Sequence, residues 1–126
     1  MRPATATDFL VVVGAVSAGV HAGLAPEHLH EWLPLGASFV AAAAAAALGV
    51  AALVFRPASV WPPRVLGALL ASLVVAYAAT RLAALPPLDP DREPLDALGV
   101  CTSTLEAAGL VAAFRLVLAY NPGGTA

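Results

Sequence analysis

The amino-acid sequence predicts an all-α membrane protein, an antiparallel four-helix transmembrane bundle in a single domain of residues 1–126. Two features of the sequence lead to this prediction. Of the 126 residues, 60% are hydrophobic and only 11% are charged, whereas a soluble domain is typically about 45–50% apolar and about 25% charged. The apolar residues also form four long segments separated by proline-containing stretches. So few charges do not cover a soluble surface of this size, and we expect a lipid bilayer as the solvent.

Each of the four apolar segments has the length of a membrane span. A helix needs about 20 predominantly apolar residues to cross the hydrocarbon, and lipid requires a helix because it offers free backbone amides no hydrogen-bond partner. A secretory signal peptide is the competing interpretation of the first segment, but Asp8 beside the apolar run and the three later segments favour a retained helix. The predicted spans are residues 8–25, 35–55, 64–85 and 95–120.

The arginines predict how the bundle is oriented in the cell membrane. In an up-and-down bundle, one face collects four of the six basic residues, namely Arg2, Arg56, Arg64 and Arg115. The positive-inside rule assigns that face to the cytoplasm. The opposite face receives residues 21–32 and 86–94, which together contain one arginine and five acidic residues. We therefore expect both termini in the cytoplasm and residues 21–32 on the outer side.

Residues 21–32, "HAGLAPEHLHEW", gather three histidines and two glutamates in an otherwise apolar region. Proline is unfavourable inside a helix, so we expect the first span to end at Pro26 and a short interfacial helix to begin there. In that short helix, His28 and Glu31 stand three residues apart and share one face, whereas His30 points elsewhere. The same break separates His21 from His28, so that no continuous helix connects them.

Polar residues inside the last span form a single stripe. Asp96, Gly99, Ser103 and Glu106 are spaced by three, four and three residues, which places them on one helical face. Glu106 lies about 15 Å below the outer boundary at 1.5 Å per residue. Ionisable groups at such depth are costly, and they usually face a bundle interior or a water-filled cavity. Glu106 is therefore the strongest single candidate for a functional residue.

The first and third spans also carry polar groups in their outer halves. Tyr77 and Arg81 are four residues apart and share a face of the third span. Ser17 and His21 have the same spacing in the first span. Because three spans place polar groups at similar depth, the sequence predicts a polar pocket that opens to the outside.

Two ligand classes suit this pocket. Imidazole and carboxylate groups bind divalent transition metals such as zinc, copper(II), nickel or iron, and the candidate metal ligands are His21, His28, Glu31 and Glu106. A small polar molecule is the other class, and the candidate ligand-binding residues are Tyr77, Arg81, Asp96, Ser103 and Glu106. The first predicted function is therefore a binding protein for a divalent metal or a small polar ligand.

Alternatives that need no ligand stay open. The histidines of residues 21–32 also suit a solvated rim that Trp32 anchors at the lipid headgroups. Arg81 can pair with Asp96 or with Glu106 only to fix helix register. The alternative function is a structural or assembly subunit of a larger membrane complex. Its alanine-rich segment, residues 41–47, would pack against a membrane-protein partner or a second copy, since small side chains let helices approach closely.

Several other function classes find no support in the sequence. The net charge of −2 argues against nucleic acid as a partner. The lone Cys101 makes no internal disulfide or CxxC motif. His21 is the one histidine inside a predicted span, which argues against haem held by two histidines. No residue is predicted to be catalytic, because no histidine is close in sequence to the serine or the cysteine of the last span.

Three stretches carry a resemblance to other proteins: "EHLHEWLPLGASF" at 27–39, "YAATRLAALPPLDP" at 77–90, and Glu106. With them the chain resembles uncharacterised small four-span membrane proteins of high-GC actinobacteria. This resemblance implies a four-helix fold and a membrane location. It implies no substrate and no catalytic residue.

Overall fold

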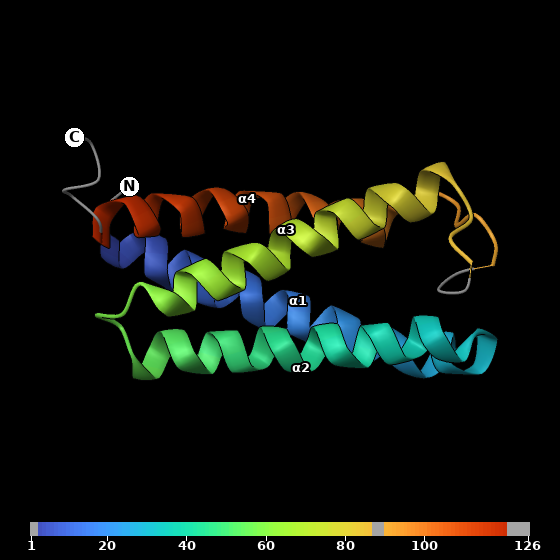
Figure 1. Cartoon of the computed structure of the whole chain (residues 1–126), viewed down its shortest axis with the longest axis horizontal. Coiled ribbons are helices and arrows are strands. Elements are labelled where there is room, and N and C mark those ends of the chain that lie inside the picture. The colour runs from blue at the N-terminus through green and yellow to red at the C-terminus, as the bar shows by residue number, and fades with distance from the viewer. Residues whose placement is uncertain (1–2, 87–89, 121–126) are drawn as a thin grey trace.

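A computed structural model describes residues 3–86 and 90–120, and these residues form four helices (Figure 1). The helices are α1 (Pro3–Glu31), α2 (Leu33–Phe55), α3 (Trp61–Leu82) and α4 (Ala97–Tyr120). Each helix packs against the next one in the chain, and α4 also packs against α1, which closes the bundle. Consecutive helices run in opposite directions. The predicted all-α antiparallel four-helix bundle is confirmed.

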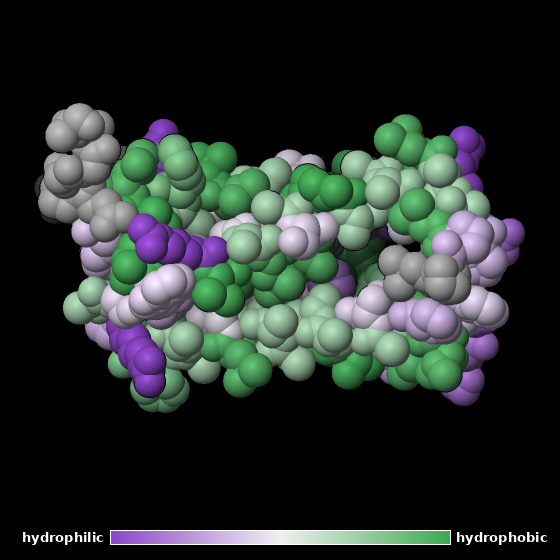
Figure 2. All heavy atoms as spheres, in the orientation of Figure 1, coloured by the Kyte–Doolittle hydropathy of each residue, from purple (hydrophilic) through white to green (hydrophobic). Residues whose placement is uncertain are grey.

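All four helices are long and apolar enough to cross a membrane. Large hydrophobic side chains lie exposed on their outer faces, among them Leu48, Val75 and Phe114. In Figure 2, hydrophobic residues cover most of the length of the visible face, and the most hydrophilic ones gather at its two ends. A bilayer explains this pattern, because lipid and not water then contacts the exposed apolar side chains. The chain is a multi-pass membrane protein.

One half of the bundle, here called the packed half, holds the hydrophobic core. It contains the beginnings of α1 and α3 and the ends of α2 and α4. Its buried core residues are Ala6, Leu10, Val13, Leu53, Leu66, Leu70, Ala113 and Leu116. The Tyr120 hydroxyl donates a hydrogen bond to the Pro57 carbonyl and so ties the end of α4 to the α2–α3 connection.

Glycines on two helices make room for one leucine in the packed half. Leu66 of α3 is fully buried. A Cβ atom added at Gly14 would lie 3.2 Å from Leu66 Cδ2, and one added at Gly49 would lie 3.1 Å from Leu66 Cδ1. The Leu66 side chain thus occupies space that the missing side chains of α1 and α2 leave open. Small residues have this role in membrane bundles, where close packing replaces the hydrophobic effect between helices.

The other half, here called the hollow half, contains the α1–α2 connection and the segment before α4. The buried polar residues are Ser17, Thr80, Thr102 and Glu106. They lie between the middle of the helices and this end of the bundle. Hydrophobic core and buried polar groups are therefore separated along the bundle axis.

The structure corrects the predicted end of the first span. α1 does not stop at Pro26 but continues to Glu31, so Pro26 lies inside it. Proline inside a helix removes one backbone hydrogen bond, and its ring crowds the carbonyl four residues earlier, but membrane helices tolerate this because the freed carbonyl finds other partners. His21 and His28 are consequently seven residues apart on one continuous helix and lie on the same side of it. The short interfacial helix predicted from Pro26 is the last part of α1, which Trp32 alone connects to α2.

The segment between α3 and α4 begins earlier and ends later than predicted. α3 ends at Leu82 because Ala83 has an extended backbone, with φ −153° and ψ 155°. α4 begins at Ala97, where the Asp96 carboxylate accepts a 2.6 Å hydrogen bond from the Gly99 amide. An aspartate in this position caps a helix, because it satisfies an amide of the first turn that has no partner in the helix.

The structure describes some of the charged residues that predict the orientation of the bundle. Arg56, Arg64 and Arg115 lie toward the end of the packed half, as the up-and-down topology predicts. Arg2 and Asp89 lie outside the described residues. Which side of the membrane this end faces stays a prediction.

Candidate functional site

The hollow half contains a cavity of about 440 Å³, here called the polar cavity. All four helices and the segment before α4 contribute to its wall. A hollow is visible toward this end of the molecule in Figure 2. The cavity wall includes all eight residues predicted for metal or ligand binding: His21, His28, Glu31, Tyr77, Arg81, Asp96, Ser103 and Glu106. The structure thus brings these residues to one cavity, and their binding roles stay predictions.

Exposure falls from one end of the polar cavity to the other. The Glu31 side chain is 58% exposed, the His28 and His21 side chains are 16% and 14% exposed, and the Glu106 side chain is 3% exposed. Glu31, His28 and His21 follow one another down a single face of α1. The cavity therefore has a solvent-accessible rim at the end of α1 and a buried floor at Glu106.

At the floor, α1 and α4 meet through a buried hydrogen bond. The Ser17 hydroxyl donates to Glu106 Oε1 at 2.6 Å. Glu106 Oε1 also lies 4.0 Å from His21 Nδ1. Among the described residues, Ser17 is the hydrogen-bond partner of this carboxyl group, and Glu106 Oε2 accepts no hydrogen bond. The floor thus presents a carboxyl oxygen to the cavity.

The backbone of α1 orients His21. Its Nδ1 lies 2.9 Å from the Ser17 carbonyl oxygen. A carbonyl oxygen only accepts, so in the neutral ring Nδ1 carries the proton and Nε2 carries the lone pair. A backbone carbonyl often fixes metal-binding histidines in this tautomer. His21 therefore offers an acceptor nitrogen in the wall of the cavity.

The rim holds a group of three possible metal ligands. His28 Nδ1 and Glu31 Oε2 are 3.1 Å apart on α1, and Glu93 approaches them from the segment before α4. The ligand atoms of the three residues all lie within 4.8 Å of one another. The Glu93 amide donates to the Thr80 carbonyl at 3.1 Å, which fastens this segment to the end of α3.

This rim group differs from the predicted set of metal ligands, which stays a prediction. In the part of the chain that the structure describes, His28, Glu31 and Glu93 are the one group of three or more such residues close enough to share an ion. His21 and Glu106 do not belong to it and form a separate pair nearer the floor. The predicted four residues do not assemble around one point, because His21 lies two helical turns from His28.

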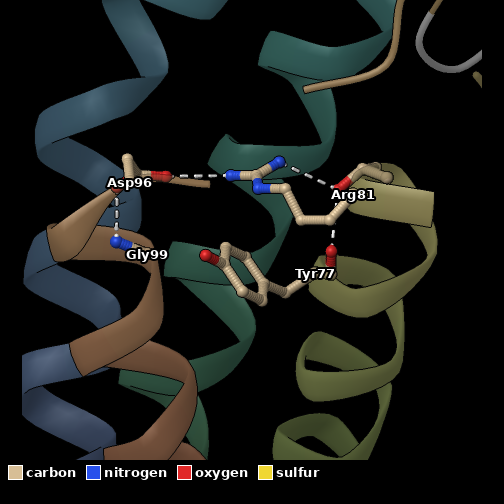
Figure 3. Close-up of polar contacts among 5 residues, drawn as sticks. Tyr77, Arg81, Asp96 and Gly99 are labelled. Atoms are coloured by element: carbon tan, nitrogen blue, oxygen red, sulfur yellow. Dashed lines mark hydrogen bonds and ion pairs between the residues drawn. The ribbon is translucent and has the colours of Figure 1, made fainter. Parts of the chain in front are cut away.

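Arg81 is held on three sides, as Figure 3 shows. One terminal nitrogen donates to Asp96 at 3.0 Å and the other to the Thr80 hydroxyl at 3.1 Å. The guanidinium lies 4.3 Å above the centre of the Tyr77 ring, a favourable cation–π arrangement. The sequence left open whether Arg81 pairs with Asp96 or Glu106, and the structure shows the pair with Asp96.

Two polar atoms beside this ion pair lack partners. The Tyr77 hydroxyl and Arg81 Nε are buried, and neither makes a hydrogen bond to any described residue. The Tyr77 ring also lies against Gly99 of α4, where an added Cβ would be 2.5 Å from Tyr77 Cε2. Gly99 therefore lets the ring reach across to α4. A buried hydroxyl without a partner is costly, unless a ligand or water completes it.

The cavity wall contains more acidic than basic residues. Five of its residues are acidic: Glu27, Glu31, Glu93, Asp96 and Glu106. Arg81 is the one arginine in the cavity wall, and it already pairs with Asp96. The Gly99 amide and the Arg81 guanidinium hold the pKa of the Asp96 carboxyl below its usual value, so Asp96 keeps its charge. The cavity is therefore suited to cations.

Sequence reasoning missed three residues of the site. Ser17 shares a face with His21 in the sequence, but only the structure shows its bond to Glu106. Glu93 lies in a segment without periodicity, so no spacing places it at the rim. Phe39 of α2 has its ring centre 5.2 Å from that of His21 and 4.3 Å from that of His28. The spacing of polar residues in the sequence gives no indication that Phe39 belongs to the site.

No known protein family matches this chain, and neither does any curated protein or solved structure. The resemblance to actinobacterial four-span proteins accordingly stays a prediction.

Proposed function

We propose that this protein is a small multi-pass membrane binding protein that binds a divalent transition metal ion at the rim of its polar cavity. The ligands are His28, Glu31 and Glu93. The observation that supports this proposal is the convergence of one imidazole and two carboxylates from α1 and the segment before α4, with ligand atoms within 4.8 Å of one another.

The chemistry of this group suits zinc or a similar ion. Zinc binds imidazole nitrogen and carboxylate oxygen at about 2.0–2.2 Å, and sites that keep an open position use three protein ligands. Ligand atoms around such an ion are then about 3.4 Å apart. His28 and Glu31 are already 3.1 Å apart, so Glu93 needs only a small approach. Two carboxylates also neutralise the charge of a divalent ion.

The proposal includes an orientation. We propose that the end with Arg56, Arg64 and Arg115 faces the cytoplasm of a cell membrane, together with both termini, because arginines are enriched on the cytoplasmic side. The rim then faces outward and takes its metal from the extracytoplasmic side. Cysteine labelling from the outside tests this, with a cysteine introduced at exposed His30 and Cys101→Ser as background.

Metal binding is tested on the whole protein, purified in mild detergent without a metal-binding tag. We expect about one equivalent of bound metal by elemental analysis, and saturable zinc binding by calorimetry after chelation. His28→Ala and Glu93→Gln should each weaken zinc binding by at least about 10–100-fold, since this range already applies to residues that only hold a metal ligand in place. A metal-free protein that ignores added zinc would refute the proposal.

Two matched variants serve as controls. Glu27→Gln changes a carboxylate that lines the same cavity but does not belong to the rim group. His30→Ala changes an exposed histidine of the same helix. Both should bind zinc like the unchanged protein. A metal-free chain that co-purifies with another membrane protein would instead support the alternative function, an assembly subunit of a larger complex.

A further inference from the structure

The floor of the polar cavity lies apart from the rim ligands and has a composition of its own. We infer that it binds a small organic cation, a protonated amine that carries a compact apolar group. The site consists of Glu106, His21, Tyr77 and Ser103, with Phe39 and Leu98 in the apolar wall. This inference does not depend on metal binding at the rim.

The size of the cavity calls for more than a metal ion. Its volume is about 440 Å³, and cavities of about 300–1,000 Å³ are typical of sites for small organic molecules. Such sites are mostly apolar, with a few polar groups that fix the orientation of the ligand. The side chains of Leu24, Phe39 and Leu98 provide the apolar surface here.

The free hydrogen-bonding groups select a cation over an anion. Glu106 Oε2 accepts no hydrogen bond among the described residues, and the carboxyl group has no arginine beside it. An anionic ligand would need a free cation, but the charge of Arg81 is already paired with Asp96, and Nε is the one guanidinium nitrogen that makes no hydrogen bond to a described residue. A protonated amine brings only donors and a positive charge.

Three helices supply acceptors for the N–H groups of an amine. α4 supplies Glu106 and the Ser103 hydroxyl, and α1 supplies His21 Nε2, since the Ser17 carbonyl occupies Nδ1. α3 supplies the Tyr77 hydroxyl, which is buried without a partner. A ligand that accepts from or donates to this hydroxyl removes the cost of leaving it unpaired. The aromatic ring of Phe39 in the cavity wall also favours a cation.

The acidic rim would favour the approach of such a ligand. Glu27, Glu31 and Glu93 surround the accessible end of the cavity, and a cleft lined by one sign of charge raises the local concentration of opposite charge. In the unbound protein, the negative charges of the wall outnumber its one arginine. An amine therefore improves the charge balance of the cavity, whereas an anion worsens it.

The test uses 2-phenylethylamine as the probe and calorimetry on the whole protein in lipid nanodiscs at neutral pH. The uncharged 2-phenylethanol and the anionic 3-phenylpropionate are matched in size, and empty nanodiscs correct for partition into lipid. We expect saturable binding of the amine, at least about tenfold tighter than the alcohol, because a charge-assisted hydrogen bond is lost in the alcohol. Equal binding of amine and alcohol, or tighter binding of the anion, would overturn the inference.

Variants locate the binding at the floor. Glu106→Gln should weaken amine binding about tenfold or more, while Glu27→Gln, at the rim, should change it less than about threefold. If Glu106→Gln fails to fold, Tyr77→Phe keeps the ring and removes only the hydroxyl, and it should weaken binding severalfold. Unchanged amine affinity in a folded Glu106→Gln variant, or in Tyr77→Phe where the former does not fold, would overturn the inference.

The proposal of zinc binding at the rim and the inference of amine binding at the floor can be refuted independently of each other. Zinc titration of Glu106→Gln tests the rim without the floor, and amine titration of His28→Ala tests the floor without the rim. Zinc binding without amine binding would refute only the inference about the floor. Amine binding without zinc binding would refute only the metal proposal.

Discussion

The packed half and the hollow half of this bundle are built from the same four helices but differ in what lies between the helices. In the packed half, fully buried leucines such as Leu10, Leu53 and Leu116 fill the space between helices. In the hollow half, the buried polar residues are Ser17, Thr80, Thr102 and Glu106, and a cavity of about 440 Å³ separates the helices. Dense packing in one half thus holds apart the helix ends that form the cavity in the other.

The two halves also differ in what a substitution should change. A side chain removed from the packed half leaves a void that its neighbours fill only partly, and the free energy of unfolding falls. A side chain changed in the wall of the cavity alters what the cavity binds, and it has few packing contacts to lose. Stability should therefore depend on the packed half, and binding on the hollow half.

The largest effect on stability is expected for Leu66→Ala. Leu66 is fully buried and occupies the space beside Gly14 and Gly49. Its loss should lower the free energy of unfolding by about 2–5 kcal/mol, the range for buried leucines. Leu98→Ala is the matched change in the hollow half, where the side chain is 49% exposed, and it should cost less than about 1 kcal/mol. Reversible unfolding in mixed micelles measures both, and equal losses would contradict the division into two halves.

A second test fills space in the packed half. A Cβ atom at Gly109 would lie 2.6 Å from Val13 Cγ1 and 2.9 Å from Leu70 Cδ1. Gly109→Ala should therefore destabilise the protein by about 1–3 kcal/mol through overpacking. At Gly19 an added Cβ meets nothing within 4 Å, so Gly19→Ala should be neutral or stabilising by up to about 1 kcal/mol. Thermal unfolding of the two variants decides whether close contact or helix propensity determines the result.

A third test moves one wall of the cavity. Gly99→Ala places a Cβ against the ring of Tyr77, so the ring and its hydroxyl must shift. We expect amine affinity to fall about threefold to tenfold, while zinc affinity at the rim stays the same. The variant to compare with Gly99→Ala is Ser103→Ala, which removes a hydroxyl from the cavity wall but leaves the ring of Tyr77 in its position. A Gly99→Ala variant that binds the amine normally would show that the position of Tyr77 does not matter.

The smallest effect concerns pH. Because the pKa of Asp96 is lowered in the folded protein, its charge stabilises the fold above pH of about 4, and this contribution disappears as the pH falls through the folded pKa. Asp96→Asn keeps a helix-capping side chain but loses the pair with Arg81. It should cost less than about 1 kcal/mol at neutral pH, since solvent screens a half-exposed pair.

The pH dependence of the difference provides the check. The stability gap between Asp96→Asn and the unchanged protein should narrow as the pH drops below about 4, where the carboxylate of the latter becomes protonated. Chemical unfolding at several pH values measures this gap. A gap that widens on acidification would mean that Asp96 is not stabilised in its charged form.

The fold was predictable from the sequence because hydrophobic segment length and backbone hydrogen bonding leave few choices in lipid. Within each helix, the candidate residues face the same cavity because residues three and four apart lie on one helical face, as Ser103 and Glu106 do. Contacts between helices were not predictable. The bond from Ser17 to Glu106 and the position of Glu93 depend on helix rotation and on an irregular segment, which no periodic pattern determines.

Pro26 gives the end of α1 a mechanical property that the rest of the helix lacks. It lies between His21 and His28, and it has no amide hydrogen to donate to the carbonyl four residues earlier. At this point α1 resists bending least. The rim segment 27–31 can thus tilt relative to the preceding part of α1, which keeps Ser17 and His21 beside Glu106. Such a tilt would let the proposed rim site adjust to the radius of a metal ion.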